Sequence, residues 1–379
     1  MSAGKIPPDQ EAKSRLPQPS SILGGLAQRL QDGVRSLPLE ISRSRTEMPD
    51  AAAVPGLRFV LPTGGGLAYG DVTLDDRSRA YLLQHVSDLE DPVGRGAAWV
   101  TLWEEVLGGR VQARAFLDAA LRAVPHEPIE QNVQLVLGYL DRAFWTFLPA
   151  DARRALSPEL ERMLRAGIAR SGSSSLKATY FSAFRSVVTT ADGTSFLERV
   201  WRRQEKIPGL TLAEPDEAGM ALDLAVRSVP AAAAILEEQR GRFTNPDRKA
   251  RFEFVMPALS ASAETRDGFF QSLADVKNRR REPWVVEGLS YLNHPLRGAQ
   301  SETYVRPALE LLPEIQRTGD IFFPKNWMDA TLSGHNTLQA ADTVRAFLAA
   351  RPDVPDRLRR IVLQSADTLF RASGMSLQP

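Results

Sequence analysis

The sequence predicts an all-α protein, a HEAT-like solenoid of stacked helix pairs that is preceded by a short β segment and a disordered N-terminal tail. Three observations predict this class. Apolar residues recur at helical spacing over most of the 379 residues. The connectors between these segments are short and carry Gly, Pro, Asp or Ser, which begin and end helices. Runs that alternate apolar and polar residues are confined to one short stretch, so we do not expect a core built on a sheet.

The N-terminal stretch, residues 1–55, is rich in Pro, Ser, Gln and Ala and has one short apolar patch. This composition is typical of a disordered or weakly structured tail, because it buries too little apolar surface to offset the entropy lost on ordering. At most, we expect a weak helix over residues 21–34.

A β segment is expected over residues 56–75. Residues 57–62 and 67–74 form two β-type runs, and Thr63-Gly64-Gly65-Gly66 joins them as a flexible turn. The runs are interpreted as a β-hairpin or as the last strands of a sheet domain. Two strands alone are not stable in water, so this segment needs a partner surface.

A helical pattern then continues over residues 76–375. Asp91-Pro92 begins one helix, with Asp as the cap and Pro in the first turn, and Gly108-Gly109 ends it. About sixteen such segments follow one another, and antiparallel pairs stacked in chain order are the economical packing for them. The segments show no fixed repeat period. A compact multi-helix bundle is the alternative architecture.

The overall composition excludes several classes of function. Lys plus Arg number 47 and Asp plus Glu number 46, so the net charge of +1 gives no basis for binding nucleic acid or an anionic membrane. The sequence has no cysteine, which excludes disulfides, thiolate zinc sites and a cysteine nucleophile. No apolar run is long enough for a membrane span. The N-terminus does not resemble a signal peptide, so a cytoplasmic location is expected for the chain as given.

Several local strings are more specific than a helical solenoid requires. Leu61-Pro62-Thr63-Gly64-Gly65-Gly66-Leu67-Ala68-Tyr69-Gly70 is followed closely by Asp91-Pro92-Val93-Gly94-Arg95-Gly96-Ala97-Ala98-Trp99. Further strings include Asn245-Pro246-Asp247-Arg248, His294-Pro295-Leu296-Arg297 and Thr318-Gly319-Asp320-Ile321-Phe322-Phe323-Pro324. Taken together over residues 57–373, they resemble the end of the β-sandwich domain and the C-terminal helical domain of bacterial membrane-alanyl-type (gluzincin) zinc aminopeptidases.

The resemblance implies an ERAP-type C-terminal helical solenoid, which in the family forms a bowl over the active site and gates or contacts the peptide substrate. It implies a catalytic aminopeptidase domain or chain as partner, with zinc as the cofactor of the parent enzyme. The chain itself has four histidines, His85, His126, His294 and His335, and none pair at i and i+4 as a His-Glu-x-x-His zinc helix requires. It also lacks the family's Gly-x-Met-Glu-Asn loop. We therefore expect no catalytic residue, no metal ligand and no peptidase activity from this chain alone.

A cationic side chain on the wall of such a bowl would suit a peptide carboxylate, and arginine fits it best. The candidates are Arg248, Arg251, Arg279, Arg280, Arg281 and Arg297. The alternative is that they form ion pairs with the nearby acids Asp247, Glu253, Asp267 and Glu282.

Two further interpretations stay open. The aromatic run from Phe322 to Trp327 is either part of the core, which clustered aromatic residues favour, or a loop that lines a concavity. The chain as a whole is either the separated part of an aminopeptidase or a free-standing α-solenoid scaffold that binds proteins or peptides in its groove.

Overall fold

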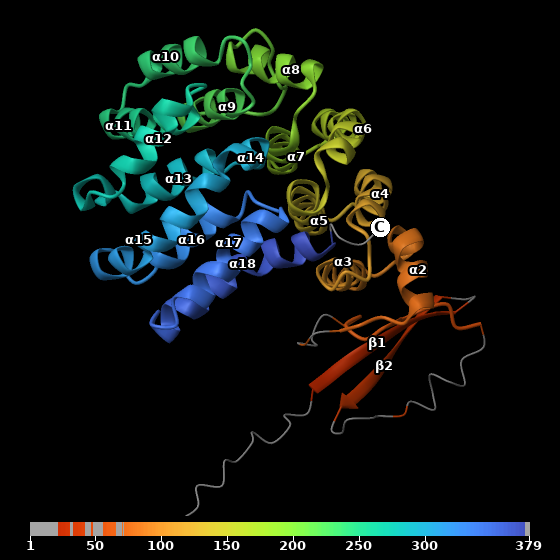
Figure 1. The fold of residues 1–379 in the computed structure, drawn as a ribbon. Helices are drawn as coiled ribbons and strands as arrows, with labels where there is room; N and C mark the ends of the chain where they lie inside the picture. The colour runs from red at the N-terminus through yellow and green to blue at the C-terminus, as the bar shows by residue number, and fades with distance from the viewer. Residues whose placement is uncertain are drawn as a thin grey trace, which may run out of the picture. The chain divides into compact units, whose positions relative to one another are not determined.

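The computed structural model describes residues 22–30, 33–41, 47, 56–65, 70 and 72–375. Over these residues the protein is predominantly α-helical with a short β segment, which confirms the predicted fold class (Figure 1). The chain divides into two compact units, Met1–Thr101 and Leu102–Pro379.

The first unit contains three strands, β1 (Ile22–Leu30), β2 (Gly33–Ile41) and β3 (Val60–Leu61), in the antiparallel order β2-β1-β3. Leu61 lies opposite Ala27, so β3 pairs with β1. Residues 72–75 form no strand, and residues 66–69, with Tyr69, lie outside the described residues, so the hairpin between 57–62 and 67–74 stays a prediction.

The helix expected over residues 21–34 is wrong, because β1 and β2 occupy this region. Gly24 and Gly25 disfavour a helix, and a connection of two residues between the strands suits a hairpin. The rest of the predicted N-terminal tail, apart from residue 47, lies outside the described residues.

The β segment of the first unit is tied to the helix that follows it. This unit also contains α2 (Asp76–His85), η1 (Val86–Asp88) and most of α3 (Pro92–Leu107). Asp75 caps α2 by accepting a hydrogen bond of 2.9 Å from the Ser78 amide, and the Ser78 hydroxyl accepts one of 2.9 Å from the Val60 amide. The ring of Phe59 stacks on Tyr81 at 5.3 Å. These contacts supply the partner surface that the short β segment needs.

The second unit consists of two layers of helices. The first layer contains α4 (Ala113–Ala123), α6 (Ala150–Arg170), α8 (Ala191–Trp201), α10 (Ala232–Arg242), α12 (Ala263–Ser272), α15 (Val305–Thr318) and α17 (Leu338–Ala350). The second, called the inner layer below, contains α5 (Glu130–Arg142), α7 (Ser174–Val187), α9 (Glu214–Val226), α11 (Pro246–Val255), α13 (Glu282–Leu292), α16 (Phe323–Leu332) and α18 (Asp356–Met375). Within the inner layer α5 packs against α7, α11 against α13, α13 against α16 and α16 against α18.

Short helical turns connect the layers. The connecting turns are η2 (Val124–His126), η3 (Ala143–Phe147), η4 (Met256–Leu259), η5 (Val276–Arg279), η6 (Pro295–Arg297), η7 (Glu302–Tyr304) and the one-turn helix α14 (Gly298–Ser301). The turn η3 is π-helical and directly extends α5. It provides the surface on which the last helices of the unit pack.

The C-terminal helices return to the beginning of the second unit and close the inner layer into a ring. Helix α18 packs against η3, and it lies close to α5 in Figure 1. The Arg371 guanidinium donates a hydrogen bond of 3.0 Å to the Leu107 carbonyl oxygen. The Asn336 amide donates one of 3.0 Å to the Thr146 carbonyl oxygen. This closure distinguishes the unit from an open solenoid, whose repeats contact only their neighbours.

The aromatic run that follows Asp320 is divided between the core and the surface. Phe323 and Trp327 are buried, and the Trp327 indole donates a hydrogen bond of 3.1 Å to the Ala308 carbonyl oxygen. The core interpretation is therefore confirmed for these two residues. Phe322 is 66% exposed, so the core interpretation is wrong for this residue. Asp320 explains the division, because its carboxylate accepts hydrogen bonds from the amides of Phe322 and Phe323 and begins α16 at Phe323.

Candidate functional site

Two of the six candidate arginines are buried and bind main-chain carbonyl groups. Arg297 is 6% exposed and donates hydrogen bonds of 2.9 and 2.8 Å to the carbonyl oxygens of Ala258 and Leu259. Arg279 is 3% exposed and donates to the carbonyl oxygens of Leu273 and Ala274. These donors satisfy carbonyl groups at the ends of helical turns, which have no partner within the helix. Arg279 also pairs with Glu314 on α15 at 3.3 Å, an inter-helix ion pair with another partner than those predicted. The carbonyl contacts support a structural role that the sequence-based alternatives did not include.

The same arrangement recurs along the chain. Arg266 donates to the carbonyl oxygens of Ser260 and Ala261, and in the first unit Arg95 donates to those of Leu89 and Glu90. Like Arg279, each of these arginines binds the carbonyls six and five residues before it. In each arginine one terminal nitrogen, Nη1, donates to both carbonyl oxygens. Arg95, Arg266 and Arg279 thus bind the ends of helical turns in the same way.

Arg248 and Arg251 are exposed and lie together at a small pocket of about 80 Å³. Arg248 pairs with Glu214 at 3.0 Å, and Arg251 donates two hydrogen bonds of 2.6 Å to Glu287. The pocket lies among α9, α11 and α13, and Phe252 contributes to its apolar side. These are the two predicted peptide-contact residues that the structure brings together.

The predicted acidic partners of the arginines bind other groups. Glu253 lies 3.8 Å from Arg240, and Asp267 accepts a hydrogen bond of 2.6 Å from the Tyr304 hydroxyl. Glu282 accepts one of 3.0 Å from the Asp320 amide. Ion pairing is thus a correct description of Arg248, Arg251 and Arg279, with different partners. Of the two remaining candidates, Arg280 is exposed and Arg281 stacks on Trp284 at 5.3 Å.

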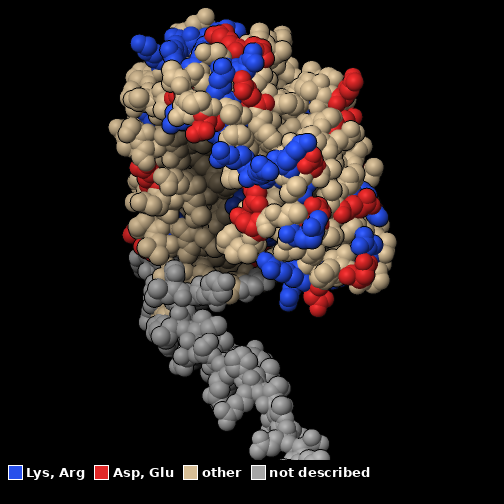
Figure 2. Space-filling view, turned by 90° about the vertical axis from the view of Figure 1, so that its left-hand side faces the viewer, with Lys and Arg blue, Asp and Glu red and all other residues tan. Residues whose placement is uncertain are grey.

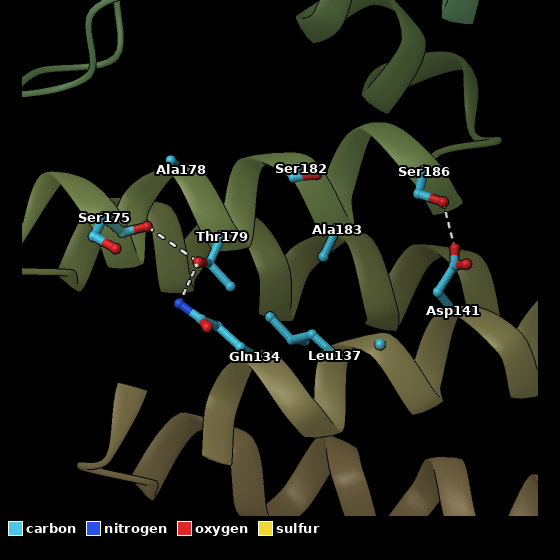
Figure 3. Close-up of a pocket in the computed structure, with 10 residues that line it drawn as sticks. Gln134, Leu137, Asp141, Ser175, Ala178, Thr179, Ser182, Ala183 and Ser186 are labelled. Atoms are coloured by element: carbon cyan, nitrogen blue, oxygen red, sulfur yellow. Dashed lines mark hydrogen bonds between the residues drawn. The ribbon is translucent and has the colours of Figure 1, made fainter. Parts of the chain in front are cut away.

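A larger groove of about 570 Å³ runs between the inner-layer helices α5 and α7 (Figure 3). Helix α5 contributes Gln134, Leu137, Gly138 and Asp141, and helix α7 contributes Ser175, Ala178, Thr179, Ser182, Ala183 and Ser186. Small side chains keep it open. A Cβ atom added at Gly138 would meet no heavy atom within 4 Å.

The two ends of the groove are polar. At one end the Gln134 side-chain amide lies 3.5 Å from the Thr179 hydroxyl, and at the other the Ser186 hydroxyl donates a hydrogen bond to Asp141. Burial raises the pKa of the Asp141 carboxyl, although this hydrogen bond and the charges of Arg142 and Arg227 act in the opposite direction. The lining includes no Lys, Arg or His. Asp141 is therefore the ionisable group that faces a ligand here.

Charged side chains of the inner layer form contacts between this groove and the pocket that contains Arg248 and Arg251. Arg185 of α7 pairs with Asp223 of α9 at 2.8 Å. Arg227 donates hydrogen bonds to the carbonyl oxygens of Asp223 and Ser186, at 2.7 Å each, and thereby holds the ends of α7 and α9 together. Burial and the neighbouring charges of Asp223 and Glu287 raise the pKa of Tyr291 on α13. These contacts link α7, α9 and α13 between the groove and the pocket.

The four histidines do not form a metal site. His294 contacts the Trp145 ring at 5.0 Å, and a His335 ring nitrogen lies 3.3 Å from the Asn293 side-chain oxygen. His85 pairs with Asp88, and His126 is exposed. Among the described residues, no three His, Cys, Asp or Glu side chains are placed to hold one metal ion.

The comparisons with known proteins found no family model and no curated protein that matches this chain. Within the part of the chain that the structure describes, none of the helices has the length and apolar character of a membrane span.

Proposed function

We propose that this chain forms the non-catalytic helical part of a zinc aminopeptidase, which encloses the active site of a catalytic domain or chain and contacts the peptide substrate. The proposal starts from the resemblance of residues 57–373 to the C-terminal region of that family. The activity of the parent enzyme would be the removal of N-terminal residues from peptides. The chain contributes a shaped wall that excludes water and large substrates, which requires no reactive group of its own.

The observation that carries the proposal is the closure of the inner layer. The contacts of Asn336 with Thr146 and of Arg371 with Leu107 join helices that are far apart in the sequence. Figure 2 looks onto the side that carries α11 and α15 in Figure 1 and shows a hollow whose walls are mostly uncharged. A closed ring of packed helices is rigid enough to limit the size of what enters such a hollow.

The proposal is tested with the purified chain and a panel of aminoacyl chromogenic substrates, with and without added zinc. We expect no turnover and no tightly bound zinc from the chain alone. We also expect it to bind a separately produced His-Glu-x-x-His catalytic domain of this family that lacks its own helical domain. Failure to bind that domain, or zinc-dependent turnover by the chain alone that persists after repurification, would contradict the proposal.

The open groove between α5 and α7 favours a second candidate, a free-standing α-solenoid scaffold that binds peptides without chemistry. Its volume of about 570 Å³ is within the range of sites that bind small ligands. The two candidates differ in their need for a partner. A scaffold is expected to bind peptides as a monomer and not to bind the catalytic domain. A pull-down in which the folded monomer retained no peptide would exclude the scaffold.

A further inference from the structure

The length of the α5–α7 groove suits a short extended peptide. Ser175 and Ser186 mark its two ends on α7 and are eleven positions apart. At the rise of an α-helix this separation is about 16 Å. An extended chain advances about 3.3 Å per residue, so about five residues fit along the groove.

The lining can bind the main chain of such a segment. In the part of the chain that the structure describes, the hydroxyls of Ser175 and Ser182 form no hydrogen bond, and both residues are exposed. A serine hydroxyl can donate to a carbonyl oxygen and accept from an amide. Gly138 and Ala178 have no side chain beyond Cβ, so a peptide main chain can approach the helices closely.

The charge at one end of the groove selects for a cation. Asp141 makes no ion pair with the described residues, and its hydrogen bond comes from a neutral hydroxyl, that of Ser186. The cations whose charges act on Asp141 are those of Arg142 and Arg227. The Arg227 guanidinium already donates to main-chain carbonyls, among them those of Val188 and Asp223. A carboxylate at the edge of a groove without a lining cation complements a lysine or arginine side chain.

We propose that the α5–α7 groove binds an extended peptide segment of about five residues and that Asp141 pairs with a lysine or arginine side chain of this segment. The inference rests on the proposed peptide contact of the inner layer, which both candidate functions share. It adds a preference for basic peptides and a residue that determines the preference.

The test measures equilibrium binding to the full chain by fluorescence anisotropy. The probes are labelled pentapeptides that differ at one position, which carries lysine, norleucine or glutamate. We expect the lysine peptide to bind about tenfold more tightly than the norleucine peptide, the factor that corresponds to about 1.4 kcal/mol. The glutamate peptide binds more weakly than both. Equal affinity for the three peptides would overturn the role of Asp141.

Two variants separate the groove from the rest of the surface. Asp141→Asn is expected to remove the preference for lysine and leave the affinity for the norleucine peptide unchanged, whereas Asp342→Asn, an exposed acid on α17, changes neither. A Cβ atom at Gly138 would meet nothing within 4 Å, so Gly138→Leu places its side chain in the open groove and is expected to weaken the binding of both peptides about tenfold or more. Gly is a poor helix former, so the Leu variant keeps or raises the melting temperature, and lost binding cannot be ascribed to unfolding.

The pH dependence of binding supplies an independent readout. As the pH falls from about 7 to about 4, Asp141 gains a proton and the lysine peptide loses its advantage. The Asp141→Asn variant shows no such change in preference. Persistence of the lysine preference after Asp141 is protonated would overturn the pairing.

The possible failures are distinguishable. If peptides bind equally well to Gly138→Leu, they bind elsewhere on the chain, and this inference fails while the proposed function stands. If spermidine competes as strongly as the lysine peptide, the site recognises a free polyamine, which overturns the peptide part of the inference. If no peptide binds, the groove inference and the scaffold candidate both fail, while the wall of an aminopeptidase can still be tested with the catalytic domain.

Discussion

Asn336 and Thr146 are separated by 190 residues in the sequence, and the Asn336 amide donates a hydrogen bond of 3.0 Å to the Thr146 carbonyl oxygen. The acceptor lies in the π-helical turn η3, where the hydrogen-bond pattern of the preceding α-helix changes. A side chain from the loop between α16 and α17 therefore stabilises an irregular turn at the other end of the helical unit.

Replacing this amide should weaken the closure of the ring. For Asn336→Ala we expect the free energy of unfolding in urea to fall by about 1 kcal/mol, the usual net contribution of one hydrogen bond. Asn326→Ala is the matched control, because Asn326 is exposed on α16 and changes the free energy little. Equal effects of the two variants would contradict the role of the Asn336 contact.

The structural role of Arg297 predicts a large loss of stability. Arg297→Met leaves the carbonyl oxygens of Ala258 and Leu259 buried without their donor, and each such group costs about 1–3 kcal/mol. Arg280→Met, at an exposed position, should change the free energy of unfolding by less than about 0.5 kcal/mol. A stable Arg297→Met protein with weakened peptide binding would instead support the substrate contact that the sequence suggested.

The glycines Gly334 and Gly138 should respond oppositely to alanine. A Cβ atom at Gly334 would lie 1.5 Å from the Asn293 carbonyl oxygen, whereas one at Gly138 would meet nothing within 4 Å. Gly334→Ala should therefore cost about 3 kcal/mol or prevent folding, because main chain must move. Gly138→Ala should gain about 1 kcal/mol from helix propensity. Chemical denaturation of both variants checks this contrast, and a neutral Gly334→Ala would contradict the tight contact.

Two histidines whose pKa values are lowered in the folded chain should make the protein less stable in acid. Burial, together with the charges of Arg227, Arg297 and Arg153, lowers the pKa of His294 to about 3, and burial lowers that of His335 to about 4. The ordinary pKa is about 6.5, so below this pH the unfolded chain takes up protons that the folded chain does not. Stability is therefore lost as the pH falls from about 6.5 toward 4, by up to about 1.4 kcal/mol per pH unit for each group.

Urea unfolding at several pH values between about 7 and 5 measures this slope above the range in which most carboxyl groups titrate. The variants His294→Gln and His335→Gln should reduce it, and His126→Gln, at an exposed position, should not. Burial raises the pKa values of Asp141 and Glu282. These two carboxyl groups bind protons more tightly in the folded chain than in the unfolded chain, so their protonation adds stability as the pH falls. An unchanged slope in both the His294→Gln and the His335→Gln variants would show that other groups carry the pH dependence.

Local signals predicted the helices well. Asp91-Pro92 was expected to begin a helix, and α3 begins at Pro92 with the Asp91 carboxylate accepting a hydrogen bond of 2.7 Å from the Gly94 amide. Such signals act within one turn, so a single sequence contains them. The role of Arg297 could not be predicted in this way, because its acceptors Ala258 and Leu259 lie 39 and 38 residues away.

The α5–α7 groove was missed because its lining is small, polar and without a motif. One signal was present, since Ser175, Thr179, Ser182 and Ser186 are spaced so that they share one face of a helix. Asp141 could not be connected to that face from the sequence, because the contact between α5 and α7 is tertiary. Phe322 and Phe323 illustrate the same limit, as adjacent and identical side chains whose burial differs with the helix that begins between them.

The closure of the inner layer also has a consequence for how the chain folds during synthesis. An open array of repeats can form step by step as each repeat leaves the ribosome, because its contacts are local. In this protein η3 and Leu107 receive their partners only when Asn336 and Arg371 emerge, more than 180 residues later. Contacts between such distant residues slow folding. Until synthesis is nearly complete, the surface of the early helices that receives these contacts is exposed to solvent. A chaperone that covers this surface would raise the yield of native protein.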